Sequence, residues 1–400
     1  MSDPRRWAGA YVVASGILAI VFAAAILTGP YRAVQRSDYM TYQTAVRIVL
    51  EARGDCLYTV ACQSRAQRDL IGEEPSFSHG ALPFNSPPWL AAVLVPLGPL
   101  PLAVAFALFT LLSIAALAVG VWRLAWGGAG TRLVATLLVL SAWPTVMAVI
   151  RGQSTLAVAG ILGLSVASSL SGHPVRAGAY LGLAALKPTL MPVLSVRLVV
   201  ERRWRALAAA AIVLVALVVL AALVVSPKAV TDYPAYLLDL SRTDSATGVH
   251  VDQMINWRGA ALRLGAGGSP LAMAGIMLTL GLTAAAWWWA RHSPRAGALG
   301  ASISLVATPL VIPHANQHEA IVAMLGILLA VAALQELRTR LAAGAIAMQG
   351  LLWIGPVLTE EAGAWLLFLA ITAWLIALVV LAWRERTGYF RPIPVTAGTD

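Results

Sequence analysis

Charge is the scarcest property of this sequence. Asp, Glu, Lys and Arg make up only 12% of its 400 residues, whereas hydrophobic types make up 59% and the mean hydropathy is +0.78. Soluble domains carry about 25% charged residues. So few charges exclude a soluble globule, a coiled coil, a disordered chain and a disulfide-rich miniprotein. A membrane β-barrel is also not expected, because barrel strands contain no long apolar runs. The composition therefore predicts an all-α, polytopic membrane protein.

Lysine and cysteine are nearly absent as well. The chain has two lysines, Lys187 and Lys228, so 26 of its 28 basic residues are arginines. The net charge of +10 does not indicate a nucleic-acid-binding protein, because the arginines stand in short clusters between apolar runs, where they set the orientation of membrane helices. Abundant Ala, Gly, Val and Arg with little Lys is typical of a GC-rich bacterial genome, so we expect a bacterial inner (plasma) membrane protein.

Long apolar runs, in contrast, are abundant. A helix needs about 20 residues to cross the hydrocarbon core. The candidate spans are 8–29, 101–122, 132–150, 154–170, 206–226, 269–290, 296–312, 319–335, 340–358 and 363–383. No cleavable signal peptide is expected, because Pro4-Arg5-Arg6 precedes a run long enough to be the first span.

The region 176–200 could cross the membrane once, or it could be two short helices that meet near Lys187-Pro188. If the chain dips in and returns, every Arg cluster falls on the cytoplasmic side, whereas one crossing would move the later clusters to the other side. Proline also interrupts a helical hydrogen-bond ladder. We therefore expect helices over 176–187 and 188–200, about twelve membrane segments in all, and both termini in the cytoplasm. The Arg clusters are Arg5-Arg6, Arg123 with Arg132, Arg176, Arg202-Arg203 with Arg205, Arg291 with Arg295, Arg338 with Arg340, and Arg384 with Arg386.

Two long segments, 30–100 and 227–268, fall on the external side. Long loops are usually functional or disordered. The first one contains aromatic and amphipathic pieces and a short apolar stretch, 85–101, so we expect interfacial helices there. Neither loop is large enough to fold alone, so residues 1–400 are predicted to form a single transmembrane domain.

Several ionisable or strongly polar residues lie at the predicted outer boundary, where such groups are functional candidates. Asp38 follows the first span; it could be a catalytic acid or base, or simply the N-cap of a helix. Arg151-Gly152-Gln153 follows the third span; it could form part of a site or be a turn with a snorkelling Arg. Lys187 has no obvious acid on neighbouring helices, so a bound phosphate is a plausible counter-ion, unless the side chain reaches the outer water.

Two further polar segments precede spans on the same side. Residues 250–258 read His-Val-Asp-Gln-Met-Ile-Asn-Trp-Arg and could bind a ligand or be an ordinary polar loop. Residues 313–319 contain His314 and His318, which one helix face could carry together. Glu319 would point elsewhere on a helix, so we favour a hydrogen-bonding site for phosphate or sugar over a metal site.

Cys56 and Cys62 lie in the first external loop. An external loop is in an oxidising compartment, so a disulfide that pins the loop is expected rather than two free thiols.

These pieces, taken in order, resemble the GT-C glycosyltransferases and, more closely, glycosyltransferase family 87, the polyprenyl-phosphate-mannose-dependent α-1,2-mannosyltransferases. The matching stretches are Ser37-Asp38-Tyr39, Phe84 to Pro88 with Pro96-Leu97 and Leu100-Pro101, Arg151-Gly152-Gln153, Ala177-Gly178 to Lys187-Pro188-Thr189, Arg202 to Arg205, Asn256, Thr308-Pro309, and His314 or His318.

The resemblance implies a GT-C fold and a transfer of sugar, by default mannose, from a polyprenyl-phosphate donor to a hydroxyl of a glycolipid or lipid-linked glycan on the external face. The family's catalytic acid follows the first span, and Asp38 is the matching residue. We expect it to be the general base of an inverting reaction. The candidate donor-binding residues are Arg258, Lys187, Arg151, His314, His318, Gln153, Asn256 and Tyr39.

No metal cofactor is expected, since a monophosphate leaving group does not demand one and the sequence has no DxD pair. The main alternative is a lipid or lipid-linked-glycan transporter or flippase, whose helices are often broken near the midplane. The break at Lys187-Pro188 fits that alternative, but the halves show no repeat. A scaffold protein is a weaker third option, because it would not need an acid, histidines and cations on one face.

Overall fold

The computed structural model describes residues 37–72, 82–125, 127–242, 253–265, 270–293, 295–333 and 359–386. These parts of the chain are helical throughout and contain no strand, although Met254 and Asn316 form one isolated antiparallel bridge. The expected spans 8–29 and 340–358 lie outside the described residues, as does His250. The α-helices are α3 (Tyr39–Leu50), α4 (Val60–Ile71), α5 (Pro88–Leu94), α6 (Leu102–Leu124), α7 (Ala129–Leu140), α8 (Trp143–Arg151), α9 (Thr155–Leu170), α10 (Pro174–Leu183), α11 (Pro192–Val200), α12 (Trp204–Val224), α13 (Pro227–Arg242), α14 (Trp257–Arg263), α15 (Pro270–Ala290), α16 (Ala296–Val311), α17 (Ala320–Ala333) and α19 (Glu360–Arg386).

Within the described residues, four helices are long and apolar enough to cross a membrane: α6, α12, α15 and α19. The pair α7–α8 replaces the expected span 132–150 and is bent by 55°, so it is a fifth span only if both helices are counted together. Helices α9, α16 and α17 are apolar but shorter. Membrane character is therefore clear, while the count of about twelve membrane segments stays a prediction.

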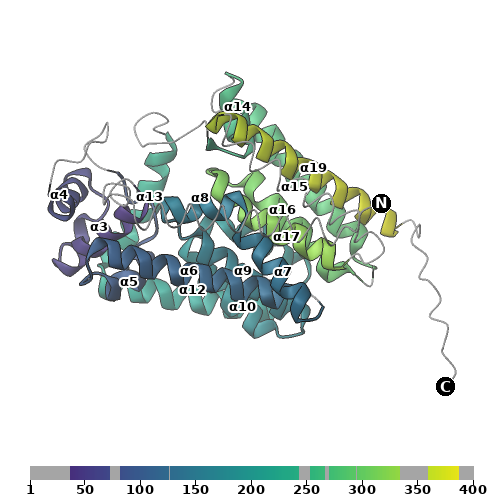
Figure 1. Ribbon diagram of the computed structural model, residues 1–400, viewed down its shortest axis with the longest axis horizontal. Helices are drawn as coiled ribbons and strands as arrows, with labels where there is room; N and C mark the ends of the chain where they lie inside the picture. The colour runs from purple at the N-terminus through teal and green to yellow at the C-terminus, as the bar shows by residue number, and fades with distance from the viewer. Residues whose placement is uncertain are drawn as a thin grey trace.

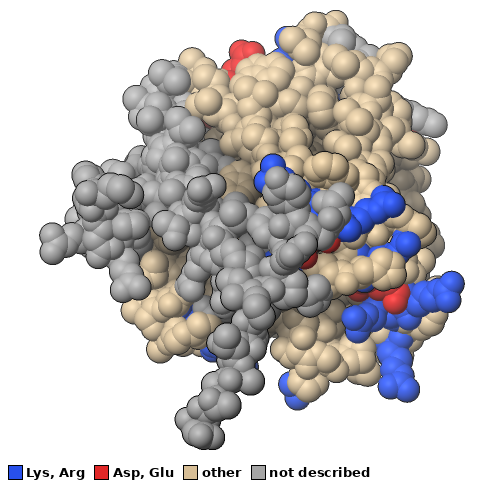
Figure 2. Space-filling model, turned by 90° about the vertical axis from the view of Figure 1, so that its right-hand side faces the viewer, with Lys and Arg blue, Asp and Glu red and all other residues tan. Residues whose placement is uncertain are grey.

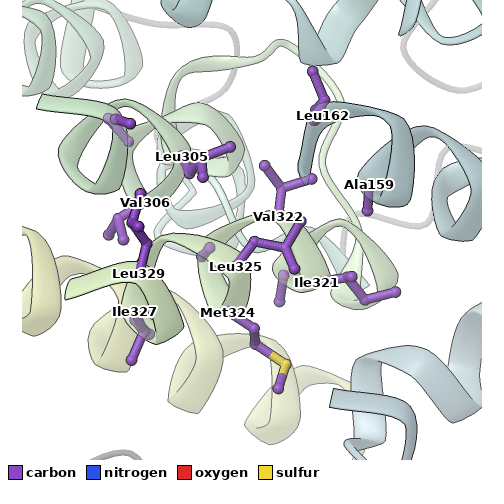
Figure 3. Close-up of a cluster of buried hydrophobic side chains, with 14 of the residues drawn as sticks. Ala159, Leu162, Leu305, Val306, Ile321, Val322, Met324, Leu325, Ile327 and Leu329 are labelled. Atoms are coloured by element: carbon purple, nitrogen blue, oxygen red, sulfur yellow. The ribbon is translucent and has the colours of Figure 1, made fainter. Parts of the chain in front are cut away.

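The main hydrophobic core lies where α16 and α17 pack between α15 and α19 on one side and α7 and α9 on the other (Figure 1). In Figure 3, Ala159 and Leu162 of α9 lie beside Ile321, Val322 and Leu325 of α17. Only 17% of the apolar window of α12 is buried, against 44% for α19. Helix α12 therefore presents most of its apolar surface outward, as a lipid-facing helix does.

Helices α6 and α9 approach each other through glycine. A Cβ at Gly120 would lie 2.2 Å from the carbonyl oxygen of Gly160, and a Cβ at Gly160 would lie 2.2 Å from the carbonyl oxygen of Ala116. No larger residue fits at these contacts, so the two backbones touch directly. Small residues allow such close packing between membrane helices.

The region 176–200 forms two short helices, as the charge pattern predicts. Helix α10 ends at Leu183 and α11 begins at Pro192. Two short 3-10 turns, η3 (Ala184–Leu186) and η4 (Pro188–Leu190), lie between them and meet at Lys187. The Trp89 Nε1 donates a 2.7 Å hydrogen bond to the carbonyl of Ala185, which fixes the break against α5.

The two helix ends away from this break lie at the Arg-rich end of the bundle, defined here by Arg176, Arg197, Arg202, Arg203, Arg205, Arg291, Arg295, Arg384 and Arg386. Arg197 of α11 donates a 2.9 Å hydrogen bond to the carbonyl of Gly297, and Arg295 pairs with Glu385 at 2.9 Å. Figure 2 shows Lys and Arg side chains gathered on one face of the molecule, with few Asp or Glu.

The described part of the first predicted loop, residues 37–72 and 82–100, contains the α-helices α3, α4 and α5. Helix α3 packs on α5 and α4, and its aromatic side chains enter a second core that includes Phe84, Phe106 and Phe109. Cys56 and Cys62 are joined by a disulfide between the turn η1 (Gly54–Cys56) and α4. The second predicted loop contains α13 and α14.

Candidate active site

Asp38 immediately precedes α3, but it does not act as a side-chain cap of that helix. Its backbone is in the helical region and its carboxylate makes no cap hydrogen bond. Instead, its N–H donates to the carbonyl of Arg151 at 2.8 Å, and its Oδ2 accepts a hydrogen bond from Gln153 Nε2. The half-buried carboxylate thus faces the junction of α8 and α9 rather than its own helix.

The junction is built by Arg151-Gly152-Gln153. Helix α8 ends at Arg151, and Gly152 adopts a left-handed conformation with φ +63°, so that the N–H of Gln153 bonds back to Ala148 at 2.8 Å. Glycine commonly terminates helices in this way. A Cβ at Gly152 would also lie 2.6 Å from the Cβ of Tyr39. Gly152 therefore both turns the chain and lets the start of α3 rest on the junction.

Lys187 lies at the break between α10 and α11 and has a buried acidic partner. Its Nζ pairs with Glu319 Oε1 and also donates to Thr155 Oγ1 at 2.7 Å and Gln153 Oε1 at 3.2 Å. A lysine ammonium has three protons, and all three have acceptors here. The expectation that Lys187 lacks an acid was wrong, because Glu319 is its counter-ion among the described residues.

Glu319 is the most enclosed charged group of the site, with a side chain only 2% exposed. Its Oε2 accepts from the N–H of Asn316 at 2.7 Å, while Oε1 receives Lys187, His318 at 2.9 Å and the hydroxyl of Thr155 at 3.3 Å. Lys187 and His318 therefore face this enclosed carboxylate with donors, and the Lys187 ammonium compensates its charge within the site.

The two histidines have different surroundings. His318 is buried against Glu319 in the turn η6 (Gln317–Glu319), whereas part of the His314 ring is open to solvent and its Nε2 lies 3.4 Å from Asn316 Nδ2. The protein around His314 still removes enough water to lower its pKa to about 4, despite the opposing charge of Glu319. His314 is therefore the neutral, accessible imidazole at pH 7.

Helix α14 brings Arg258 toward His314. Asn256 caps this helix by accepting from the N–H of Gly259 at 2.8 Å, and its amide donates to the carbonyl of Ile312 at 2.7 Å. Asn256 is buried and pins α14 to the chain just before His314. Arg258 is the second residue of α14, so the Asn256 cap also fixes the backbone that carries its guanidinium.

Arg151 reaches the start of α19. Its Nη2 lies 3.6 Å from Glu360 Oε1, and the other oxygen of Glu360 accepts from Gln253 at 2.8 Å. The side chain of Arg151 is 28% exposed. The arginine therefore lies at the rim of the site and is not a simple snorkelling residue.

Tyr39 lies in the aromatic core beneath α3. It is 1% exposed, its hydroxyl lies 3.4 Å from Gln43, and its ring packs on Phe106 and Phe109. Its position indicates packing that supports Asp38 rather than a direct substrate contact.

The structure thus joins four of the nine predicted site residues, Asp38, Gln153, Lys187 and His318, in one chain of contacts that passes through Glu319. Sequence reasoning missed Glu319 as a site residue, together with Thr155 and Glu360. A signal for Glu319 was present: Asn316 and Glu319 have the Asn-x-x-Glu spacing of a helix start, directly before the apolar run of α17. Among the described residues, no group of three or more His, Cys, Asp or Glu side chains is arranged to hold a metal ion.

An all-helical membrane protein with a carboxylate, histidines and arginines at one end of the bundle is a candidate membrane enzyme. The model of glycosyltransferase family 87 matches residues 84–313, more than half of the chain. The protein belongs to this family and is a membrane glycosyltransferase. No curated protein and no solved structure gives a significant match. The matched region includes Gln153, Lys187 and Arg258, while Asp38, His314 and Glu319 lie beyond its ends.

Proposed function

We propose that this glycosyltransferase moves a sugar, most simply mannose, from a polyprenyl-phosphate donor to a hydroxyl of a glycolipid or lipid-linked glycan, with inversion and with Asp38 as general base. The observation that carries the proposal is the state of the Asp38 carboxylate. Its Oδ2 is held by Gln153, whereas Oδ1 has no hydrogen-bond partner among the residues that the structure describes. An oriented carboxylate with one open oxygen can accept a proton from an acceptor hydroxyl.

The chemistry needs one base and a stabilised leaving group. Asp38 removes the acceptor proton as the acceptor oxygen attacks the anomeric carbon from the face opposite the phosphate. The bond between that carbon and the phosphate oxygen breaks, and the electron pair leaves with the polyprenyl phosphate. Attack from the opposite face by a single displacement inverts the configuration. A phosphomonoester is an adequate leaving group without a divalent metal, so none is included.

Arg258, Arg151 and the histidines are the proposed ligands of the leaving phosphate. Arginine has a planar fork of donors that matches phosphate oxygens. Arg151 lies one residue before the glycine that supports Asp38, and Arg258 lies on the helix that Asn256 joins to Ile312, two residues before His314. Lys187 is omitted from this role, because its three protons already have protein acceptors.

The proposed arrangement in the membrane places the Asp38 end outside and the Arg-rich end in the cytoplasm of a bacterial cell. The positive-inside rule supports this orientation. The polyprenyl tail would lie in lipid beside the helices, and the full chain would have the GT-C fold with about twelve membrane segments and both termini in the cytoplasm.

The test is sugar transfer by the purified full-length protein in liposomes, with radiolabelled polyprenyl-phosphate-mannose and a lipid extract as acceptor source. Asp38→Asn should lower the rate by about 100-fold or more, since a general base contributes about 10²–10⁴. Asp55→Asn is the matched control, because Asp55 is an exposed acid of the same loop. It should leave the rate unchanged. Near-normal transfer by Asp38→Asn would disprove the mechanism.

The same liposomes separate an enzyme from a flippase. A flippase would move labelled donor across the bilayer without forming a new glycoside. Label that changes leaflet while no product forms in the wild-type protein would overturn the proposed activity.

A further inference from the structure

We propose that Gln153 is a positioning residue: Lys187 fixes the orientation of its amide, and the amide in turn holds the Asp38 carboxylate in place for proton transfer. The Lys187–Glu319 ion pair then serves as the anchor of this arrangement. The inference rests on the function proposed above, and it assigns Gln153 a role other than binding the donor.

The orientation of the Gln153 amide follows from the chemistry of its two neighbours. A lysine ammonium can only donate and an ionised carboxylate can only accept. The amide oxygen must therefore face Lys187 and the amide nitrogen must face Asp38, as the structure has them. The reversed amide would place its N–H groups against the ammonium and its oxygen against the carboxylate, so both hydrogen bonds would be lost.

The anchor itself is fixed from several directions. Lys187 occupies a chain break that Trp89 holds through the carbonyl of Ala185 at 2.7 Å. Its ammonium pairs with the carboxylate of Glu319, which is 2% exposed. The backbone N–H of Asn316 donates a 2.7 Å hydrogen bond to the same carboxylate. An ion pair in such surroundings cannot rearrange without leaving a buried charge unpaired. The lysine therefore offers Gln153 a donor at a fixed position.

Gln153 restrains Asp38 through one carboxylate oxygen, Oδ2. Because Gln153 occupies Oδ2, the carboxylate cannot turn freely about its side-chain bond, and Oδ1 stays presented to the acceptor. A hydrogen bond to the ionised form also favours that form over the protonated one. Loss of the amide should therefore slow the reaction and make the base easier to protonate.

The experiment compares two variants of Gln153 with a control in the liposome transfer assay. Gln153→Leu removes the amide, and Gln153→Glu keeps an acceptor for Lys187 but places a negative charge against Asp38. We expect kcat to fall about 10- to 100-fold for Gln153→Leu, since a displacement of about 1 Å can cost 10²-fold. The KM for the donor should change less than twofold, and the acidic limb of the pH–rate profile should move to higher pH. Gln153→Glu should move that limb further.

Gln67→Leu is the control for general damage. Gln67 is a fully buried glutamine that makes two hydrogen bonds, both to the backbone of Leu82, at 2.6 and 3.0 Å. This variant should lose thermal stability and keep the wild-type pH profile.

Two results would overturn the inference. A raised donor KM with unchanged kcat and pH profile in Gln153→Leu would identify Gln153 as a donor ligand. A pH profile that stays at its wild-type position in both Gln153 variants would remove the link to Asp38. The proposed function fails separately, through an active Asp38→Asn variant.

Discussion

At each end of the bundle an ion pair contains a buried charged side chain, Arg197 at one end and Glu319 at the other, and the two pairs are held in different ways. Arg197, at the Arg-rich end, is 2% exposed, pairs with Glu201 four residues later at 2.7 Å, and donates to the backbone carbonyl of Gly297 at 2.9 Å. Lys187, at the Asp38 end, pairs with a glutamate 132 residues away and bonds only to side chains. The first pair closes on its own helix and fastens α11 to α16. The second leads, through Gln153, to the proposed catalytic base.

The comparison indicates which buried charges belong to function. A pair that is satisfied by its own helix and a carbonyl contributes to packing alone. The Lys187–Glu319 pair, in contrast, has hydrogen-bond partners in separate segments and contacts Asp38 through Gln153. Such a pair restrains the geometry of a site. Buried ion pairs often add little net stability relative to apolar residues, so the elaborate Lys187 cluster is better explained by positioning.

The largest expected effect comes from breaking the Lys187 pair. Lys187→Met takes the ammonium away from the buried Glu319 carboxylate and leaves it with His318 and neutral donors, which should cost about 3–5 kcal/mol in unfolding free energy. In the double variant Lys187→Met/Glu319→Gln, the charge is removed and most of that stability should return. Transfer activity should stay low in the double variant, because Gln153 has lost its anchor. Thermal unfolding in detergent and the transfer assay measure the two quantities; recovery of both would contradict a positioning role.

A smaller effect is expected at the other end of the bundle. Arg197→Met removes hydrogen bonds from a charged donor, each worth about 1.5–3 kcal/mol, but Glu201 is 28% exposed and can turn to water. We expect a net loss of about 2 kcal/mol in unfolding free energy. The transfer rate per folded molecule should equal that of the wild type. The amount of folded protein is the fraction that elutes as a single peak in size-exclusion chromatography. A matching loss of specific activity would show that the two ends are coupled.

A third effect, on activity as well as on stability, is expected at Gly152. The change Gly152→Ala places a Cβ 2.6 Å from that of Tyr39 at a φ of +63°. A left-handed alanine costs about 1–2 kcal/mol. The clash should also push the start of α3 from the junction, so we expect transfer to fall about 10-fold. Gly72→Ala, at φ +73° with open space around it, is the control: it should show the backbone cost without the loss of activity.

Much of the helical framework could be predicted from the sequence, because it depends on local apolar runs and on the prolines and arginines that separate them. The Pro188 break and the Arg clusters led to two short helices over 176–200, and the structure has them. Counting the predicted membrane spans also places Asp38, Gln153 and His318 on the same side of the membrane. These inferences need only hydropathy, charge, and whether the number of spans between two residues is odd or even.

Side-chain partners were harder to predict, because they depend on how distant segments dock. Glu319 was expected to point elsewhere on a regular helix, but it lies in a 3-10 turn whose geometry aims it at Lys187. Asn256 had been a candidate ligand; its capping of α14 depends on the local turn that precedes Trp257. Tyr39 follows Asp38 in sequence, yet the helical rotation between the two residues directs it into the core.

The separation of Lys187 and Glu319 also bears on biosynthesis. Glu319 is made 132 residues after Lys187, which at about 5–20 residues per second is a delay on the order of 10 s. Throughout that interval the ammonium lacks this carboxylate, so it needs water or another acceptor. Synthesis of the turn η6, directly before α17, then supplies the missing negative charge. The nascent enzyme cannot complete its site before Glu319 has left the ribosome.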